Sequence, residues 1–165
     1  MKLIPIRGTR NHKRDVTVAY TKVDDNDYKK LMKHKWHFSK SGRKNCYRLY
    51  VRNSEIGMIH RLIMGNPDVK KDIDHINGNT TDNRKKNLRV CTREQNSWNR
   101  KIPITNTSGY KHVLWDNQKR SWIAAVRVKG KTYVKICKKG KKEAIKQAKI
   151  MRNKYQGKFA KYEYQ

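Results

Sequence analysis

Acidic residues are scarce in this sequence: 13 Asp and Glu stand against 42 Lys and Arg in 165 residues, and the formal net charge is +29. A surplus of one sign repels itself in the compact state, so it indicates a polyanionic partner. Nucleic acid is the leading candidate, because each neutralised phosphate releases counterions. Composition alone does not separate a protein that only binds DNA from an enzyme that acts on it, or from a structural RNA-binding protein.

Cysteine and long apolar runs are scarce as well. The three cysteines, Cys46, Cys91 and Cys137, form no Cys-x-x-Cys pair. This spacing argues against a zinc ribbon and a disulfide framework, and it suits a reducing cytosol. No apolar run approaches the ~20 residues of a membrane helix, and the N-terminal run, broken by a lysine and a proline, is not expected to be a signal peptide. We therefore expect no structural zinc and no membrane partner.

The few acids are not spread evenly along the chain. The net charge is +10 over residues 1–59, +5 over residues 60–103 and +14 over residues 104–165. In the least basic segment Asp72, Asp74 and Asp82 lie close together, although carboxylates are unfavourable beside a polyanion. A bound divalent cation would account for these carboxylates, and so would hydrogen bonds that they form in turns and at helix caps.

The segments on either side predict regular elements. Alternating apolar residues indicate a strand over Asp15–Val23, the acidic run of residues 24–27 is a helix-start signal, and a second strand passes through Tyr47, Leu49 and Val51. Behind a turn-rich linker, three strand-like runs and an amphipathic helix predict a three-stranded antiparallel sheet packed on one helix. These runs are Tyr110–Trp115, Trp122–Val128, Thr132–Cys137 and Glu143–Tyr155.

The central segment predicts a strand, a loop, a returning strand and a helix. Ile73–Ile76 and Leu88–Cys91 are the two short strands. Thr92, followed three residues later by Gln95, forms a capping-box start for the helix. Such an arrangement lets Asp74, His75 and Asn96 converge at the open side of the two strands.

These residues resemble the HNH endonucleases with their ββα-metal motif, and most closely the phage and intron-encoded homing type. The pattern that carries the resemblance is His60-Arg61-Leu62, Asp74-His75, Asn77-Gly78-Asn79, Asp82-Asn83-Arg84, Asn87-Leu88-Arg89 and Asn96. His60 is open to two interpretations, phosphate positioning or packing at the start of its element. The resemblance implies a nuclease core built from two strands and one helix.

The resemblance also implies roles for four residues. His75 would be the general base that deprotonates the attacking water. Asp74 and Asn96 would hold one Mg²⁺ or Mn²⁺ ion, and an asparagine oxygen in place of histidine suits Mg²⁺ better than Zn²⁺. Asn87 would tie the loop together and orient His75. The expected products carry 5′-phosphate and 3′-hydroxyl ends.

Beyond the linker the sequence is similar to AP2-type DNA-binding domains, which occur behind HNH domains in this family. The similarity rests on Ser108-Gly109-Tyr110-Lys111, Trp115, Trp122 and the helix up to Tyr155, Gly157 and Phe159. We expect base reading from the sheet face, phosphate contacts from the basic run of residues 138–142, and the core beneath the helix for Trp122. The DNA-binding residues predicted for the whole chain are Arg61, Arg84, Arg89, Arg93, Lys111, Trp115, Arg120 and Arg127.

The predicted fold class is α+β, in four segments. They are an N-terminal strand/helix extension (residues 1–56), the HNH ββα-metal nuclease domain (57–101), a linker (102–109) and an AP2-like three-stranded antiparallel sheet packed on one helix (110–165). This organisation predicts a site-specific, metal-dependent homing endonuclease that nicks or cuts double-stranded DNA as a monomer or a DNA-templated dimer. The expected location is the cytoplasm of the bacterial host of a phage or mobile element. The alternative is a non-catalytic, sequence-specific DNA-binding regulator that keeps the HNH shape.

Overall fold

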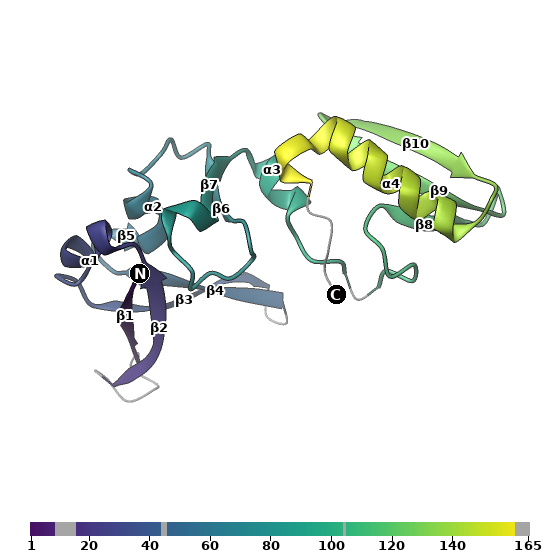
Figure 1. Ribbon diagram of the computed structural model, residues 1–165. Helices are drawn as coiled ribbons and strands as arrows, with labels where there is room; N and C mark the ends of the chain where they lie inside the picture. Colours follow the sequence, from purple (N-terminus) through teal and green to yellow (C-terminus); the bar gives the residue numbers. More distant parts are fainter. Residues whose placement is uncertain (9–15, 44–45, 104, 161–165) are drawn as a thin grey trace. The chain divides into compact units, whose positions relative to one another are not determined.

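The computed structural model describes residues 1–165 except 9–15, 44–45, 104 and 161–165, and side chains are not described for residues 42–47 (Figure 1). Asp15, the predicted beginning of the first strand, and the side chain of Cys46 therefore lie outside the described residues. The chain divides into two compact units, Met1–Thr92 and Arg93–Gln165.

The first unit is built on a five-stranded sheet in the order β2-β1-β3-β4-β5. All neighbours are antiparallel except β1 and β3, which run parallel. The predicted strand and helix are present as β2 and α1, whereas sequence reasoning missed β1 and β3. The elements are β1 (Lys2–Arg7), β2 (Thr17–Val23), α1 (Asp25–Leu31), β3 (Trp36–Arg43), β4 (Cys46–Asn53) and β5 (Gly57–Met58).

The core of this unit follows from strand alternation. Ile4 and Ile6 of β1 point to the same side and are almost wholly buried, as is Val51 of β4. Trp36 begins β3 in the same core, and its indole N–H donates a hydrogen bond of 2.8 Å to the carbonyl oxygen of Leu31. The indole therefore ties the end of α1 to the sheet.

A second, two-stranded sheet carries the central motif. β6 and β7 pair antiparallel, with Asp72 opposite Cys91 and His75 opposite Leu88. The predicted strand–loop–strand is thus confirmed, with β6 beginning and ending one residue earlier than expected. The apolar run before it is a helix. The elements are α2 (Ile59–Ile63), β6 (Asp72–His75), η1 (Lys85–Asn87) and β7 (Leu88–Cys91).

The second unit begins with α3 (Arg93–Trp98) and contains the three-stranded antiparallel sheet that the sequence predicts, in the order β10-β9-β8. α4 lies along one face of it (Figure 1), where Ala144 and Ala148 pack against Val113, Ala124 and Cys137. β9 and β10 pair without a shift in register from Val128 to Trp122. The remaining elements are β8 (Val113–Asp116), β9 (Ser121–Val128), β10 (Lys131–Cys137), α4 (Lys141–Gln156) and η2 (Gly157–Phe159).

Among the described residues, none of the helices combines the length and the apolar composition needed to cross a membrane. Cys91 and Cys137 are buried free thiols. Burial raises the pKa of Cys91 to about 11, so this side chain behaves as a small apolar residue.

Candidate active site

Asp74 and His75 end β6, and both side chains are buried, with 3% and 4% of their surface exposed. Asp74 lies opposite Arg89 in the β6–β7 ladder. Both Nε and a terminal nitrogen of Arg89 donate to Oδ2 of Asp74, at 2.9 and 2.7 Å. The guanidinium balances a carboxylate that has been removed from water, which is the condition under which a buried charge is tolerated.

The imidazole of His75 is hydrogen-bonded to Asn83: its Nε2 lies 3.0 Å from Oδ1 of the amide. Burial lowers the pKa of His75 below its ordinary value, although the bond to Asn83 acts in the opposite direction. The ring is therefore neutral at physiological pH. A neutral imidazole is the form that can take a proton from water.

Two further rings pack around His75. His60 of α2 meets it edge-on, with 5.2 Å between ring centroids, and Tyr50 of β4 lies 5.6 Å from His60 and 6.2 Å from His75. Burial, and then the neighbouring charge of His75, lowers the pKa of His60 to about 3. Of the two interpretations of His60, packing is the one that this environment favours. Sequence reasoning missed Tyr50, whose place in an alternating strand gave no signal of a site.

Asn87 fastens the loop between β6 and β7. Its Oδ1 accepts the backbone N–H of Asn77 at 3.0 Å, and its Nδ2 donates to the carbonyl oxygen of Asp82 at 2.7 Å. These bonds join the two sides of the loop, which is the tying role that the resemblance implies. The imidazole of His75, however, is hydrogen-bonded to Oδ1 of Asn83, so Asn87 can act on His75 by holding the loop that carries Asn83.

The predicted DNA-binding arginines of this unit are engaged in its internal structure. Arg84 donates to both carboxylate oxygens of Asp82, at 2.7 and 2.6 Å, and this pairing holds the pKa of Asp82 below its usual range. Arg61 donates to the carbonyl oxygens of Pro67 and Lys71. Arg61, Arg84 and Arg89 are all half-buried. Their guanidinium groups hold loops and carboxylates of this unit in place.

In the second unit the predicted residues do not share one surface. Lys111 donates its ammonium group to the carbonyl oxygens of Trp98 and Arg100. Trp115 lies opposite Trp122 in the ladder, at 5.5 Å between ring centroids, on the face that carries α4. Arg127 is five residues beyond Trp122 in β9 and so points to the opposite face. One sheet face cannot present both Trp115 and Arg127.

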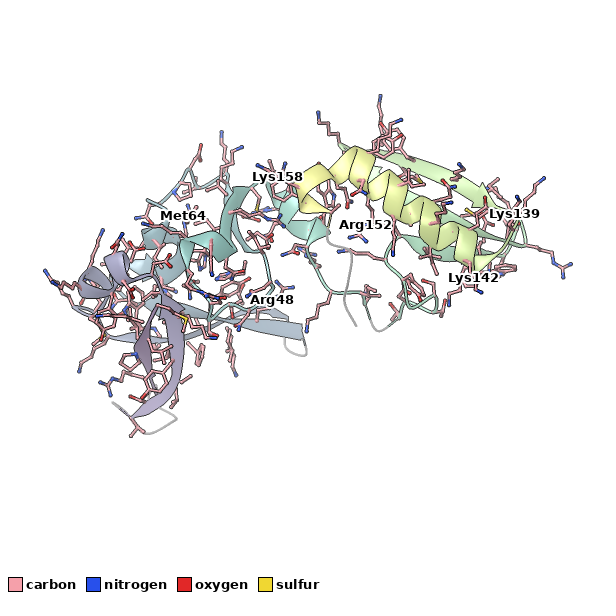
Figure 2. The ribbon with its side chains drawn as sticks, viewed as in Figure 1. Arg48, Met64, Lys139, Lys142, Arg152 and Lys158 are labelled. Atoms are coloured by element: carbon pink, nitrogen blue, oxygen red, sulfur yellow. The ribbon has the colours of Figure 1, made fainter. Side chains whose placement is uncertain are left out.

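The other predicted residues of this unit are placed as follows. Arg93 is exposed and Asn96 is half-buried, both on α3. Arg120 is exposed in the turn between β8 and β9, with a positive φ of 43°. Lys139 and Lys142, labelled in Figure 2, are exposed where β10 turns into α4. This turn belongs to the basic run for which phosphate contacts are expected.

No group of three or more His, Cys, Asp or Glu able to hold a metal ion is present in the part of the chain that the structure describes. The ligands implied by the resemblance are of another kind, one carboxylate and one amide oxygen. Both are hard oxygen donors, which suit Mg²⁺ or Mn²⁺. Asp74 is buried beside a cation, so a metal ion there would share its carboxylate with Arg89.

In the comparison with known proteins, residues 58–98 match the model of a family described as HNH endonuclease. This central segment is therefore similar to HNH endonucleases. It includes α2, β6, β7 and α3, and with them His60, Asp74, His75, Asn87 and Asn96. The family model ends at residue 98, so the AP2-type resemblance of the following segment stays a prediction.

Two viral proteins are similar to this chain. Protein 3.8 of Escherichia phage T7 is 41% identical over 61 residues, which are 37% of this chain and 50% of that protein. An uncharacterized HNH endonuclease of Acanthamoeba polyphaga mimivirus is 30% identical over 107 residues, 65% of this chain and 56% of that protein. The chain thus spans about half the length of the curated relatives it matches. No solved structure matches it.

Proposed function

We propose that this chain is a metal-dependent DNA endonuclease of the homing type, which hydrolyses phosphodiester bonds of duplex DNA to 5′-phosphate and 3′-hydroxyl ends. The observation that carries the proposal is the buried, neutral His75, held by a hydrogen bond inside the segment that matches the HNH family. The mimivirus relative, itself named an HNH endonuclease, supports the same reaction class.

His75 is the general base in this proposal. Its neutral imidazole accepts the proton of the attacking water, and Asn83 keeps the ring from rotating while it does so. Asn87 holds the loop that carries Asn83. Asp74 and Asn96 are the proposed ligands of Mg²⁺ or Mn²⁺, and the support for this pair is the sequence motif. When bound, the ion supplies positive charge that stabilises the leaving 3′-oxygen.

The flanking segments hold the DNA in this proposal. The charge surplus is largest outside the HNH domain, and exposed lysines such as Lys139 and Lys142 can neutralise phosphates without reading sequence. Base reading by the AP2-like segment would give site specificity. A single site per chain attacks one strand at a time, so a monomer nicks or cuts the strands in sequence, and a DNA-templated dimer cuts both together. The phage relative supports action in the cytoplasm of an infected bacterial host.

The experiment that tests the activity is cleavage of supercoiled plasmid with and without Mg²⁺. The wild-type chain gives open-circle or linear product only with the ion. His75→Ala loses cleavage by at least about a hundredfold while duplex binding in a mobility-shift assay is retained, because a general base contributes roughly 10²–10⁴-fold to rate. His37→Ala, a histidine of β3 outside the HNH domain, serves as the control and keeps full activity.

The alternatives give different results in the same series. A DNA-binding regulator would shift duplex DNA and leave supercoiled plasmid intact with every metal. A structural RNA-binding protein would prefer structured RNA to duplex DNA at one fixed ionic strength, the only condition under which such affinities can be compared.

A further inference from the structure

The hydrogen bonds behind His75 continue into the N-terminal sheet. Asn83 is fully buried, and its Nδ2 lies 2.8 Å from Oγ1 of Thr21 and 3.1 Å from the carbonyl oxygen of Thr80. Thr21 is also fully buried, in β2, and its hydroxyl donates to the carbonyl oxygen of Thr81 at 2.8 Å. A residue 62 positions away thus contacts the partner of His75.

These partners determine which way the amide of Asn83 points. A carbonyl oxygen can only accept, so the group facing Thr80 has to be the amide nitrogen. The single proton of the Thr21 hydroxyl is already donated to Thr81, so its oxygen accepts from Asn83 and again faces the nitrogen. Both contacts place Nδ2 toward the threonines and Oδ1 toward His75.

The orientation of the amide in turn determines the tautomer of the imidazole. Oδ1 of Asn83 is an acceptor, so the ring nitrogen 3.0 Å away, Nε2 of His75, has to carry a proton. In the neutral ring Nδ1 is then the nitrogen with the lone pair. We infer that Asn83, held by Thr21, is a positioning residue that keeps the proton of His75 on Nε2 and leaves Nδ1 as the base.

Backbone hydrogen bonds hold Thr21 and Asn83 rigidly in place. The N–H of Lys22 donates to the carbonyl oxygen of Thr81 and the N–H of Asn83 donates to that of Lys22, both at 2.8 Å. The loop thereby forms a short parallel bridge at the edge of β2. The N-terminal sheet, which the family model does not cover, is in this way part of the support of the catalytic histidine.

The inference rests on the proposed function for its catalytic meaning, but its first test needs no activity. Proton–nitrogen correlation spectra of the metal-free full-length protein at neutral pH distinguish the two imidazole tautomers, with the His75 signals assigned by their loss in His75→Gln. We expect His75 as the Nε2–H tautomer in the wild type. A His75 ring with its proton on Nδ1 would overturn the inference, whether or not the protein cleaves DNA.

Variants supply the second test. Asn83→Ala removes the acceptor, so a mixture of tautomers and a kcat lowered by roughly ten- to a hundredfold at an unchanged KM are expected, less than loss of the base itself. Thr21→Val removes the hydroxyl and shifts both readouts in the same direction, whereas Thr21→Ser restores them. Thr17→Val, also on β2 but bonded to Arg7, is the matched control and leaves both readouts unchanged.

The outcomes remain separable. If the variants fold and Thr21→Val matches the wild type in both tautomer and kcat, the role of Thr21 and Asn83 is overturned. Should Asn83→Ala unfold, the comparison of Thr21→Val with Thr21→Ser still decides. A wild-type protein that shows the Nε2–H tautomer yet cleaves no DNA under any metal would refute the proposed endonuclease and uphold the proton assignment.

Discussion

At the scale of single residues, the site depends on charges and rings that are buried with their partners. Asp74 and Arg89 form such a buried pair, because the side chain of Asp74 is 3% and that of Arg89 16% exposed. An ion pair at this depth contributes little beyond an apolar pair of the same shape, but a lone buried charge is strongly unfavourable.

Replacing Arg89 by Met therefore destabilises the protein. We expect the free energy of unfolding to fall by about 3 kcal/mol, because Asp74 stays buried without its cation. The measurement is a urea unfolding curve of the full-length chain. The matched control is Lys119→Met, which breaks the surface pair with Asp116 and costs under about 1 kcal/mol. Equal losses in the two variants would contradict the assigned burial of Asp74.

His112 makes a residue-scale prediction about pH. Burial, and then the charges of Arg152 and Lys111, lowers its pKa to about 4, while Nδ1 donates to the carbonyl oxygen of Ala125 at 3.0 Å. The unfolded chain, with the ordinary pKa near 6.5, binds the proton first, so stability falls as pH falls from about 6.5 to about 4.

The size of this effect is about 1–2 kcal/mol after allowance for the partial exposure of the ring. His112→Asn removes the titration and keeps a residue type that tolerates the positive φ of 66°. Its melting temperature should decline less than that of the wild type across this window. If the melting temperatures of the two proteins decline in parallel with pH, the pKa of His112 is not lowered by folding.

At the scale of elements, the loop between β6 and β7 is as important as the strands. Its conformation is held by side-chain amides, with Asn87 bonding to both sides of it. Neither strand pairing nor apolar packing supplies these contacts. One polar substitution at Asn87 is therefore enough to disturb the loop.

Asn87→Ala is expected to loosen this loop. The free energy of unfolding falls by about 1–3 kcal/mol because one buried and one partly buried polar partner are left without their bonds, and the amide of Asn77 exchanges its proton faster. Hydrogen exchange followed by NMR measures the second effect. Asn79→Ala, in the exposed part of the same loop, removes bonds to Thr81 and serves as the control, with a smaller loss. Unchanged exchange at Asn77 in Asn87→Ala would refute the tying role.

At the scale of the whole molecule, the +29 charge together with the proposed function predicts how DNA binding depends on salt. Binding to duplex DNA should weaken steeply with salt, since each phosphate contact contributes about −0.9 to the slope of log K against log salt. Lys139→Gln with Lys142→Gln should make this slope shallower by about 2 and weaken binding to all sequences alike. The charge-conserving pair Lys139→Arg and Lys142→Arg is the control. A slope unchanged by the glutamine pair would exclude this turn from the phosphate contacts.

Much of the architecture could be predicted from the sequence because local patterns carry it. Alternation and turn residues gave β2, β6, β7 and the sheet of the second unit, and the capping pattern gave the start of α3. β1 and β3 were missed because Pro5 interrupts the first and polar residues dominate the second. Their place in the sheet comes from pairing with strands distant in the sequence.

The sequence by itself predicted a polyanionic partner, through its charge, and a resemblance of the central segment to HNH endonucleases, which the match over residues 58–98 supports. Only the tertiary structure decided what surrounds His75. Thr21 and Asn83 are 62 positions apart and Tyr50 lies in a different strand, so no local pattern connects them to the histidine. Burial brings these groups together, and removal from water makes each hydrogen bond between them obligatory.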